Sequence, residues 1–104
     1  MQVVMTLIMQ GGNAKGQAFQ AIQAAKAGNF ESAEALLKSS NDELIAAHKT
    51  QTELLTAEAN GEHVELDLYM VHAQDHLMNA ISFRDLAVEF VGQERRLQKL
   101  EKKG

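Results

Sequence analysis

Four polar side chains of chemically useful types lie close together in the C-terminal third of the chain. They are His72, Asp75, His76 and Asn79. Residues three and four positions apart share one face of an α-helix, so a helix here would bring these side chains together. They interrupt the longest apolar stretch of the sequence, where a carboxylate such as Asp75 costs free energy unless it is paired, protonated or bound to a metal. We therefore expect the functional site of this protein to lie at this cluster.

Three interpretations of the cluster are open. In the first, His72 and His76 are metal ligands four residues apart on a helix, with Asp75 as a further ligand or a base. A catalytic zinc, however, needs three protein ligands and an open position, and His48 and His63 have no supporting motif. In the second, the histidines are surface or interface residues without chemistry. In the third, one histidine is a nucleophile for phosphoryl transfer, because a free imidazole nitrogen is nucleophilic near neutral pH. The residue types alone do not decide between the last two.

The elements that position this cluster are predicted to be long helices. The chain has no proline and only seven glycines, and Ala, Leu, Glu, Gln and Lys are plentiful. Two breaks stand out, at Gly28-Asn29 and at Asn60-Gly61-Glu62. We therefore predict an all-α fold, a single domain over residues 1–104 built as an antiparallel bundle of three helices, at about 2–27, 30–58 and 65–102.

The apolar pattern predicts how the first two helices pack. In the first, Gly11 and Gly12 each cost about 1 kcal/mol relative to alanine, so they indicate a kink or the close approach of another helix. The second helix has apolar and small residues at alternating spacings of three and four, the seam of a left-handed bundle. The seam consists of Phe30, Ala33, Leu37, Ser40, Leu44, Ala47, Gln51 and Leu54.

The third helix carries more apolar surface than two neighbours can cover. About 38 residues would extend about 57 Å, and its apolar positions occupy more than one narrow stripe. We therefore predict that the protein forms oligomers through this helix.

Composition excludes several classes of function. The formal net charge is −4, which argues against nucleic acid as a partner. The basic run at 95–103 is interrupted by Glu101 and is typical of a solvated helix end. No apolar run is long enough to span a membrane, and the first residues lack a secretory signal. The absence of cysteine excludes disulfides and thiolate chemistry and fits the cytoplasm.

The motif around the cluster resembles a known family. Residues 71–78 read VHAQDHLM, close to the active-site signature of the enzyme IIA component of the lactose/cellobiose type of the bacterial sugar phosphotransferase system. Three further segments support the resemblance in the family's order: VVMTLI at 3–8, AGNF at 27–30 and AHKTQT at 47–52. The resemblance covers nearly the whole chain and favours the phosphoryl-transfer interpretation.

The resemblance implies a role for each residue of the signature. His72 corresponds to the phosphoryl acceptor, which takes the group from the phosphocarrier protein HPr and passes it to a cysteine of the cognate enzyme IIB. Gln74, His76 and Asn79 would orient the ring or bind phosphate oxygens, and His48 is a further supporting residue from the second helix. The transported sugar is chosen by a membrane component, so the sequence predicts only a lactose-, cellobiose- or chitobiose-type sugar.

The resemblance also implies an assembly. Proteins of this family form trimers of three-helix protomers, nine helices in all, with a metal on the three-fold axis. Asp75 corresponds to the residue that supplies one ligand per protomer. Three carboxylates would repel each other unless a divalent, oxygen-preferring ion such as Mg²⁺ neutralised them. The active site is then expected between protomers.

Overall fold

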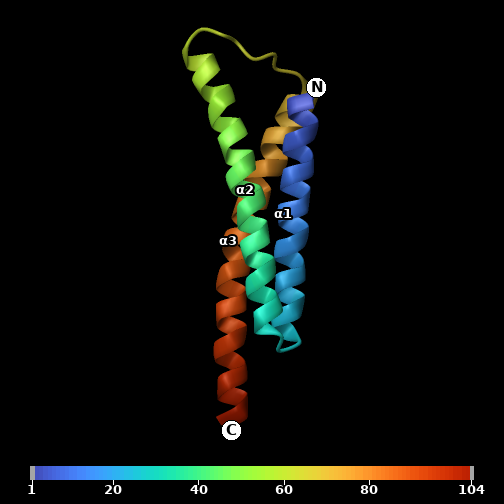
Figure 1. Ribbon diagram of the computed structural model, residues 1–104, viewed down its shortest axis with the longest axis vertical. Coiled ribbons are helices and arrows are strands. Elements are labelled where there is room, and N and C mark those ends of the chain that lie inside the picture. The colour runs from blue at the N-terminus through green and yellow to red at the C-terminus, as the bar shows by residue number, and fades with distance from the viewer. Residues whose placement is uncertain (1, 104) are drawn as a thin grey trace.

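The protein is an up-down-up bundle of three antiparallel helices. The computed structural model describes residues 2–103, and all regular structure within them is helical. Helix α1 spans Gln2–Lys26, α2 spans Phe30–Ala59 and α3 spans Leu68–Lys103. The N-terminus lies at one end of the bundle and the C-terminus at the other (Figure 1). The long dimension of 61 Å is close to the length of α3, since 36 residues extend about 54 Å. The predicted all-α, three-helix protomer is confirmed.

A glycine in the left-handed region ends α1, as predicted. Gly28 has a φ of 82°, and its amide donates to the carbonyl oxygen of Ala25 at 3.0 Å while the Asn29 amide donates to Ala24 at 2.9 Å. This hydrogen-bond pair is a Schellman motif, which a residue without a Cβ adopts most easily. The Asn29 side chain then accepts from the amide of Ser32 at 3.1 Å and caps α2.

The second break is also confirmed, but the start of α3 differs from the prediction. Gly61 has a φ of 86° and ends α2 in the same way as Gly28 ends α1. Residues 62–67 have no regular structure, and α3 begins at Leu68 rather than near residue 65. The reason is Asp67, whose carboxylate accepts from the Met70 amide at 2.8 Å and thereby caps the helix. This capping signal was present in the sequence and was missed.

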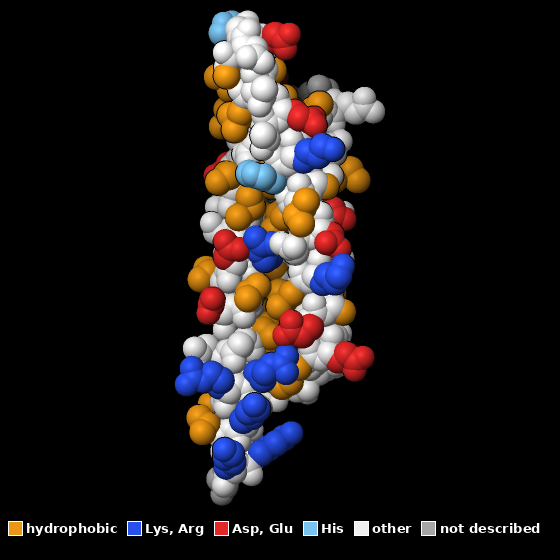
Figure 2. Space-filling model, turned by 60° about the vertical axis from the view of Figure 1, so that its left-hand side comes forward, with side chains coloured by type: hydrophobic (Ala, Val, Ile, Leu, Met, Phe, Trp, Pro, Cys, Tyr) orange, Lys and Arg blue, Asp and Glu red, His pale blue; other side chains and the backbone are white. Residues whose placement is uncertain are grey.

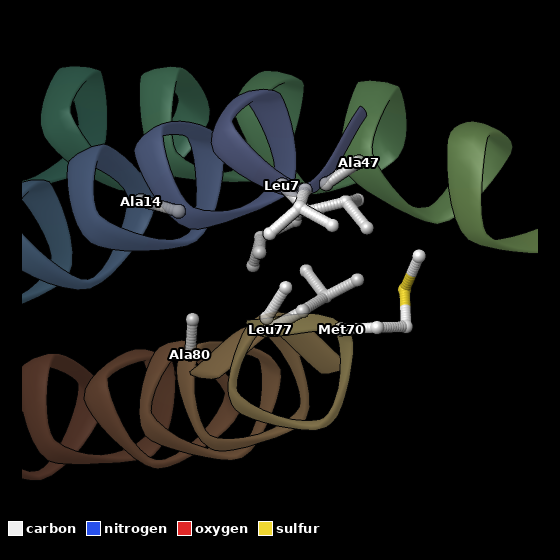
Figure 3. Close-up of a cluster of buried hydrophobic side chains, with 9 residues drawn as sticks. Leu7, Ala14, Ala47, Met70, Leu77 and Ala80 are labelled. Carbon is white, nitrogen blue, oxygen red and sulfur yellow. The ribbon is translucent and has the colours of Figure 1, made fainter. Parts of the chain in front are cut away.

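Small residues dominate the core and let the helices approach closely. Leu7 of α1 and Leu77 of α3 are fully buried and meet where the three helices join (Figure 3). The hydroxyl of Ser40, fully buried, donates to the Ala14 carbonyl oxygen at 2.7 Å, so this polar group is satisfied. The seam of α2 is confirmed at its buried positions, which are Ala33, Leu37, Ser40, Leu44 and Ala47.

The helices diverge at one end of the bundle, and one helix projects alone at the other end. The C-terminal half of α2 leans away from α1 and α3, and the last turns of α3 extend beyond the α1–α2 turn (Figure 1). Lys and Arg side chains gather at this C-terminal end (Figure 2). One of them is structural, because Arg95 pairs with Glu34 at 2.9 Å and lies over the ring of Phe30. None of the helices within residues 2–103 is both long and apolar enough to cross a membrane.

Candidate functional site

The second and third turns of α3 bring the predicted cluster together. His72, Asp75 and Asn79 are exposed, and His76 is half-buried. The imidazole rings of His72 and His76 are stacked, with centroids 5.9 Å apart and an interplanar angle of 15°. The Asn79 side-chain amide donates to a carboxylate oxygen of Asp75 at 3.3 Å. The arrangement therefore consists of an exposed imidazole supported by a second one, beside a carboxylate that points to solvent.

Helix α1 supports the cluster from one side through its glycine pair. A Cβ placed on Gly11 would lie 3.2 Å from Cδ2 of His76 and 3.6 Å from Cα of Leu77. A Cβ on Gly12 would lie 3.4 Å from Nε2 of His76. Helix α1 is continuous through both glycines, so close approach by another helix, one of the two predicted alternatives, is what occurs. The sequence indicated that something approaches this pair but not that it is His76.

Gln74 lies on the opposite side of α3 from His72. Its side-chain oxygen accepts from Nε2 of Gln51 on α2 at 2.7 Å, and its amide lies 3.6 Å from the sulfur of Met70. A step of two residues turns a helix by about 200°, which explains the separation. Within one protomer, Gln74 joins α3 to α2 and is not placed to orient His72. Gln51 was not predicted from the sequence as the partner of Gln74. The signal was the polar side chain of Gln51 in the otherwise apolar or small seam of α2.

His48 is also not placed beside His72 within the protomer. It lies on the wall of a groove of about 400 Å³ between α2 and α3, whereas His76 faces α1. Hydrophobic side chains lie along the middle of the face drawn in Figure 2, between charged ones. The groove residues are Asn41, Leu44, Ile45, His48, Gln51, Met78, Ile81 and Arg84.

The fourth histidine, His63, stabilises the α2–α3 loop. Its Nδ1 hydrogen-bonds a carboxylate oxygen of Glu58, whose other oxygen accepts from the Val64 amide at 3.2 Å. The His63 hydrogen bond, followed by that of Val64, lowers the pKa of Glu58. A lowered folded-state pKa contributes stability at neutral pH that is lost as the pH falls through it, but Glu58 is exposed and the contribution is small.

The cluster does not form a metal site within a single protomer. Among residues 2–103, no three His, Cys, Asp or Glu side chains converge as a metal centre requires. The first interpretation, in the form in which Asp75 joins His72 and His76 as a third ligand, is therefore not met within one protomer. The physical reason is that His76 turns toward α1 while Asp75 points away from the bundle.

Fold and site together define a class of protein. The imidazole of His72 is open to solvent on a rigid helix, where a macromolecule can reach it. Small-molecule enzymes enclose their substrates in pockets, whereas a nucleophile on an open face suits a carrier that exchanges a group with other proteins.

Comparison with known proteins identifies the family. The family described as "PTS system, Lactose/Cellobiose specific IIA subunit" matches residues 2–95. The cellobiose-specific EIIA component of Lactococcus lactis subsp. lactis is 65% identical over 99% of this chain and 89% of its own length. The crystal structure of the cellobiose-specific enzyme IIA from Bacillus anthracis superposes with a TM-score of 0.90 at 42% identity, covering 99% of this chain and 92% of that one.

A third relative was solved together with a partner protein. This is the IIA(Chitobiose)-HPr complex of the N,N'-diacetylchitobiose branch of the Escherichia coli phosphotransferase system. Its matching chain has a TM-score of 0.81 at 36% identity, covering 93% of this chain and 94% of that one.

The chain belongs to the lactose/cellobiose-specific IIA family of the sugar phosphotransferase system. It is a phosphotransferase component, a phosphocarrier for sugars of the cellobiose and lactose type. The resemblance inferred from residues 71–78 and the supporting segments is confirmed.

Proposed function

We propose that His72 is the residue that carries the phosphoryl group. The observation that supports this most directly is the exposed imidazole of His72 stacked on His76. Of the remaining histidines, His76 lies against α1, His48 lines the α2–α3 groove and His63 hydrogen-bonds Glu58.

The reaction consists of two displacements at phosphorus. A ring nitrogen of His72 attacks the phosphorus of a phosphohistidine on the donor protein, so that one P–N bond forms as the other breaks. A thiolate of the acceptor then attacks the same phosphorus, and the His72 nitrogen leaves with its lone pair. Such transfers require the protein mainly to position the groups and stabilise charge, and a rigid helix meets the first requirement.

The partners proposed for these steps are HPr as donor and a cysteine of the cognate enzyme IIB as acceptor. A relative of 36% identity is known in a complex with HPr, which supports the first assignment. Family membership supports the second, and the absence of cysteine in this chain means that the thiol must come from the partner. This role places the protein in the cytoplasm.

We propose that three protomers associate through α3 into a nine-helix trimer. The outward face of α3 is rich in large apolar side chains without a partner in the protomer; Leu68 is 82% exposed and Leu86 is 68% exposed. Asp75 lies in the same outward row, between Leu68 and Ser82. In such a trimer the exposed His72 side chains would lie near the borders between protomers. The exposed apolar residues of α3 are Leu68, Tyr69, Val71, Met78, Leu86, Val88, Phe90, Leu97 and Leu100.

The side chain of Asp75 fits a divalent metal on the trimer axis. It is exposed, and its carboxylate accepts one hydrogen bond, from Asn79, so it retains oxygen lone pairs for an ion. One such carboxylate from each protomer, with water, matches the all-oxygen shell that Mg²⁺ prefers. The ion would neutralise three converging negative charges, so Asp75 would serve assembly, and the transfer steps would rest on His72.

Replacing Asp75 by leucine is expected to leave the trimer intact without metal. The substitution removes the charge repulsion that the ion offsets and adds apolar surface to the seam. Sedimentation velocity in the presence of EDTA should show trimers for Asp75→Leu and a shift toward monomers for the wild type. If Asp75→Leu were only monomeric at concentrations where the metal-loaded wild type is trimeric, the proposed role of Asp75 in assembly would be contradicted.

The test of the proposed function is phosphorylation in a reconstituted relay. Intact-protein mass spectrometry after incubation with phosphoenolpyruvate, enzyme I and HPr should show one acid-labile phosphoryl group per protomer. If the folded trimer gains no adduct while the upstream proteins are active, the protein is instead a structural or regulatory helical bundle of this family.

A further inference from the structure

We propose that Gly11 and Gly12 of α1 form a seat for the ring of His76 and thereby position His72 for phosphoryl transfer. This inference rests on the proposed role of His72. It assigns a positioning function to two residues of a helix that carries none of the signature residues at 71–78.

Space, rather than backbone conformation, explains the glycine pair. Neither residue has a positive φ, since Gly28 and Gly61 are the glycines that do among residues 2–103. Helix α1 runs through the pair without interruption, where glycine is less favourable than alanine. The side chain that glycine omits at both positions would meet His76, at 3.2 Å from its Cδ2 and 3.4 Å from its Nε2.

The position of His76 depends on this packing. Its ring makes no hydrogen bond with another group of residues 2–103, so the α1 surface and the stack with His72 determine where it lies. A methyl group at position 11, closer than most real Cβ contacts, would push the His76 ring outward. Because the two rings are parallel and neighbouring, the displacement would change the rotamers open to His72.

Small displacements of a nucleophile have large kinetic effects. A misplacement of about 1 Å can cost about 100-fold in rate, so a shift of a few tenths of an ångström at His72 is expected to cost about tenfold. The donor would still dock normally, because Gly11 is buried beneath the His76 ring.

The experiment is a rapid-quench measurement of transfer from phospho-HPr to the trimeric protein. Gly11→Ala is expected to lower the maximal rate about tenfold with little change in the half-saturating HPr concentration. Gly16→Ala is the matched control, since a Cβ there meets nothing within 4 Å; it should transfer at the wild-type rate and melt at a higher temperature.

A double-mutant cycle separates the seat from a general packing defect. In a His76→Ala background the ring is gone, so Gly11→Ala should have no further effect on the rate. An equal loss of transfer rate in both backgrounds would show that the methyl group acts through the backbone at Leu77, and this would overturn the proposal. A wild-type rate for Gly11→Ala alone would overturn it as well.

A second variant keeps the test decisive if Gly11→Ala does not fold. Gly12→Ala contacts His76 alone, at 3.4 Å, and should lower the maximal rate by about threefold; an unchanged rate for a folded Gly12→Ala would then overturn the seat. If the wild-type protein itself were not phosphorylated on His72, the proposed function would fail instead, and the two failures are distinguishable.

Discussion

Replacing His72 by alanine is expected to reduce phosphorylation by phospho-HPr by more than about 1,000-fold, while the fold and the assembly are unchanged. The substitution removes the nucleophilic nitrogen, and no other histidine is placed to substitute. His76 is half-buried, with its Nε2 edge against Gly12. Because His72 is exposed, its removal leaves no cavity, so stability should change by less than about 0.5 kcal/mol.

Intact-protein mass spectrometry of the relay mixture measures this effect. His63→Ala is the matched control, since His63 is an exposed histidine outside the cluster, and this variant should accept a phosphoryl group at a rate within a few-fold of the wild type. An adduct that persists in His72→Ala and disappears in another histidine variant would move the acceptor to that residue.

Leu77→Ala is expected to destabilise the protein by about 3 kcal/mol. Leu77 is fully buried and packs with Leu7 and Met70 where the three helices meet (Figure 3). The small residues around Leu77 cannot move far enough to fill the vacated space. The variant therefore loses the transfer free energy of the deleted atoms and also carries the cost of the cavity that remains. The free energy of unfolding of a domain is about 5–15 kcal/mol, so this loss would remove a large fraction of it.

Urea unfolding followed by circular dichroism measures this loss. The protomer concentration is held fixed, because the proposed trimer would contribute to the measured stability. Leu66→Ala is the matched control, since Leu66 is 80% exposed in the α2–α3 loop, and should change stability by less than about 0.5 kcal/mol. If Leu77→Ala and Leu66→Ala unfolded at the same urea concentration, the core would not be centred on Leu77.

Local signals in the sequence were sufficient for the elements and for the cluster. Gly28 and Gly61 end helices because only a residue without a Cβ readily adopts their positive φ, and that requirement is visible in the sequence. The joint position of His72, Asp75, His76 and Asn79 follows from helical spacing alone, and the structure has them on one face. The start of α3 was placed three residues early, although Asp67 is a local capping signal.

Which neighbour each side chain contacts was decided by the tertiary structure. The α1–α3 approach places His76 on Gly11 and Gly12, the α2–α3 contact joins Gln74 to Gln51, and His48 is in a groove apart from His76. Helical periodicity defines the faces of each helix but not the rotation and depth at which one helix packs on another. Those depend on the sum of many small packing contacts between residues distant in sequence. The sequence by itself therefore determined the helices and the residues with chemical potential, and the packing of the bundle determined which of them act together.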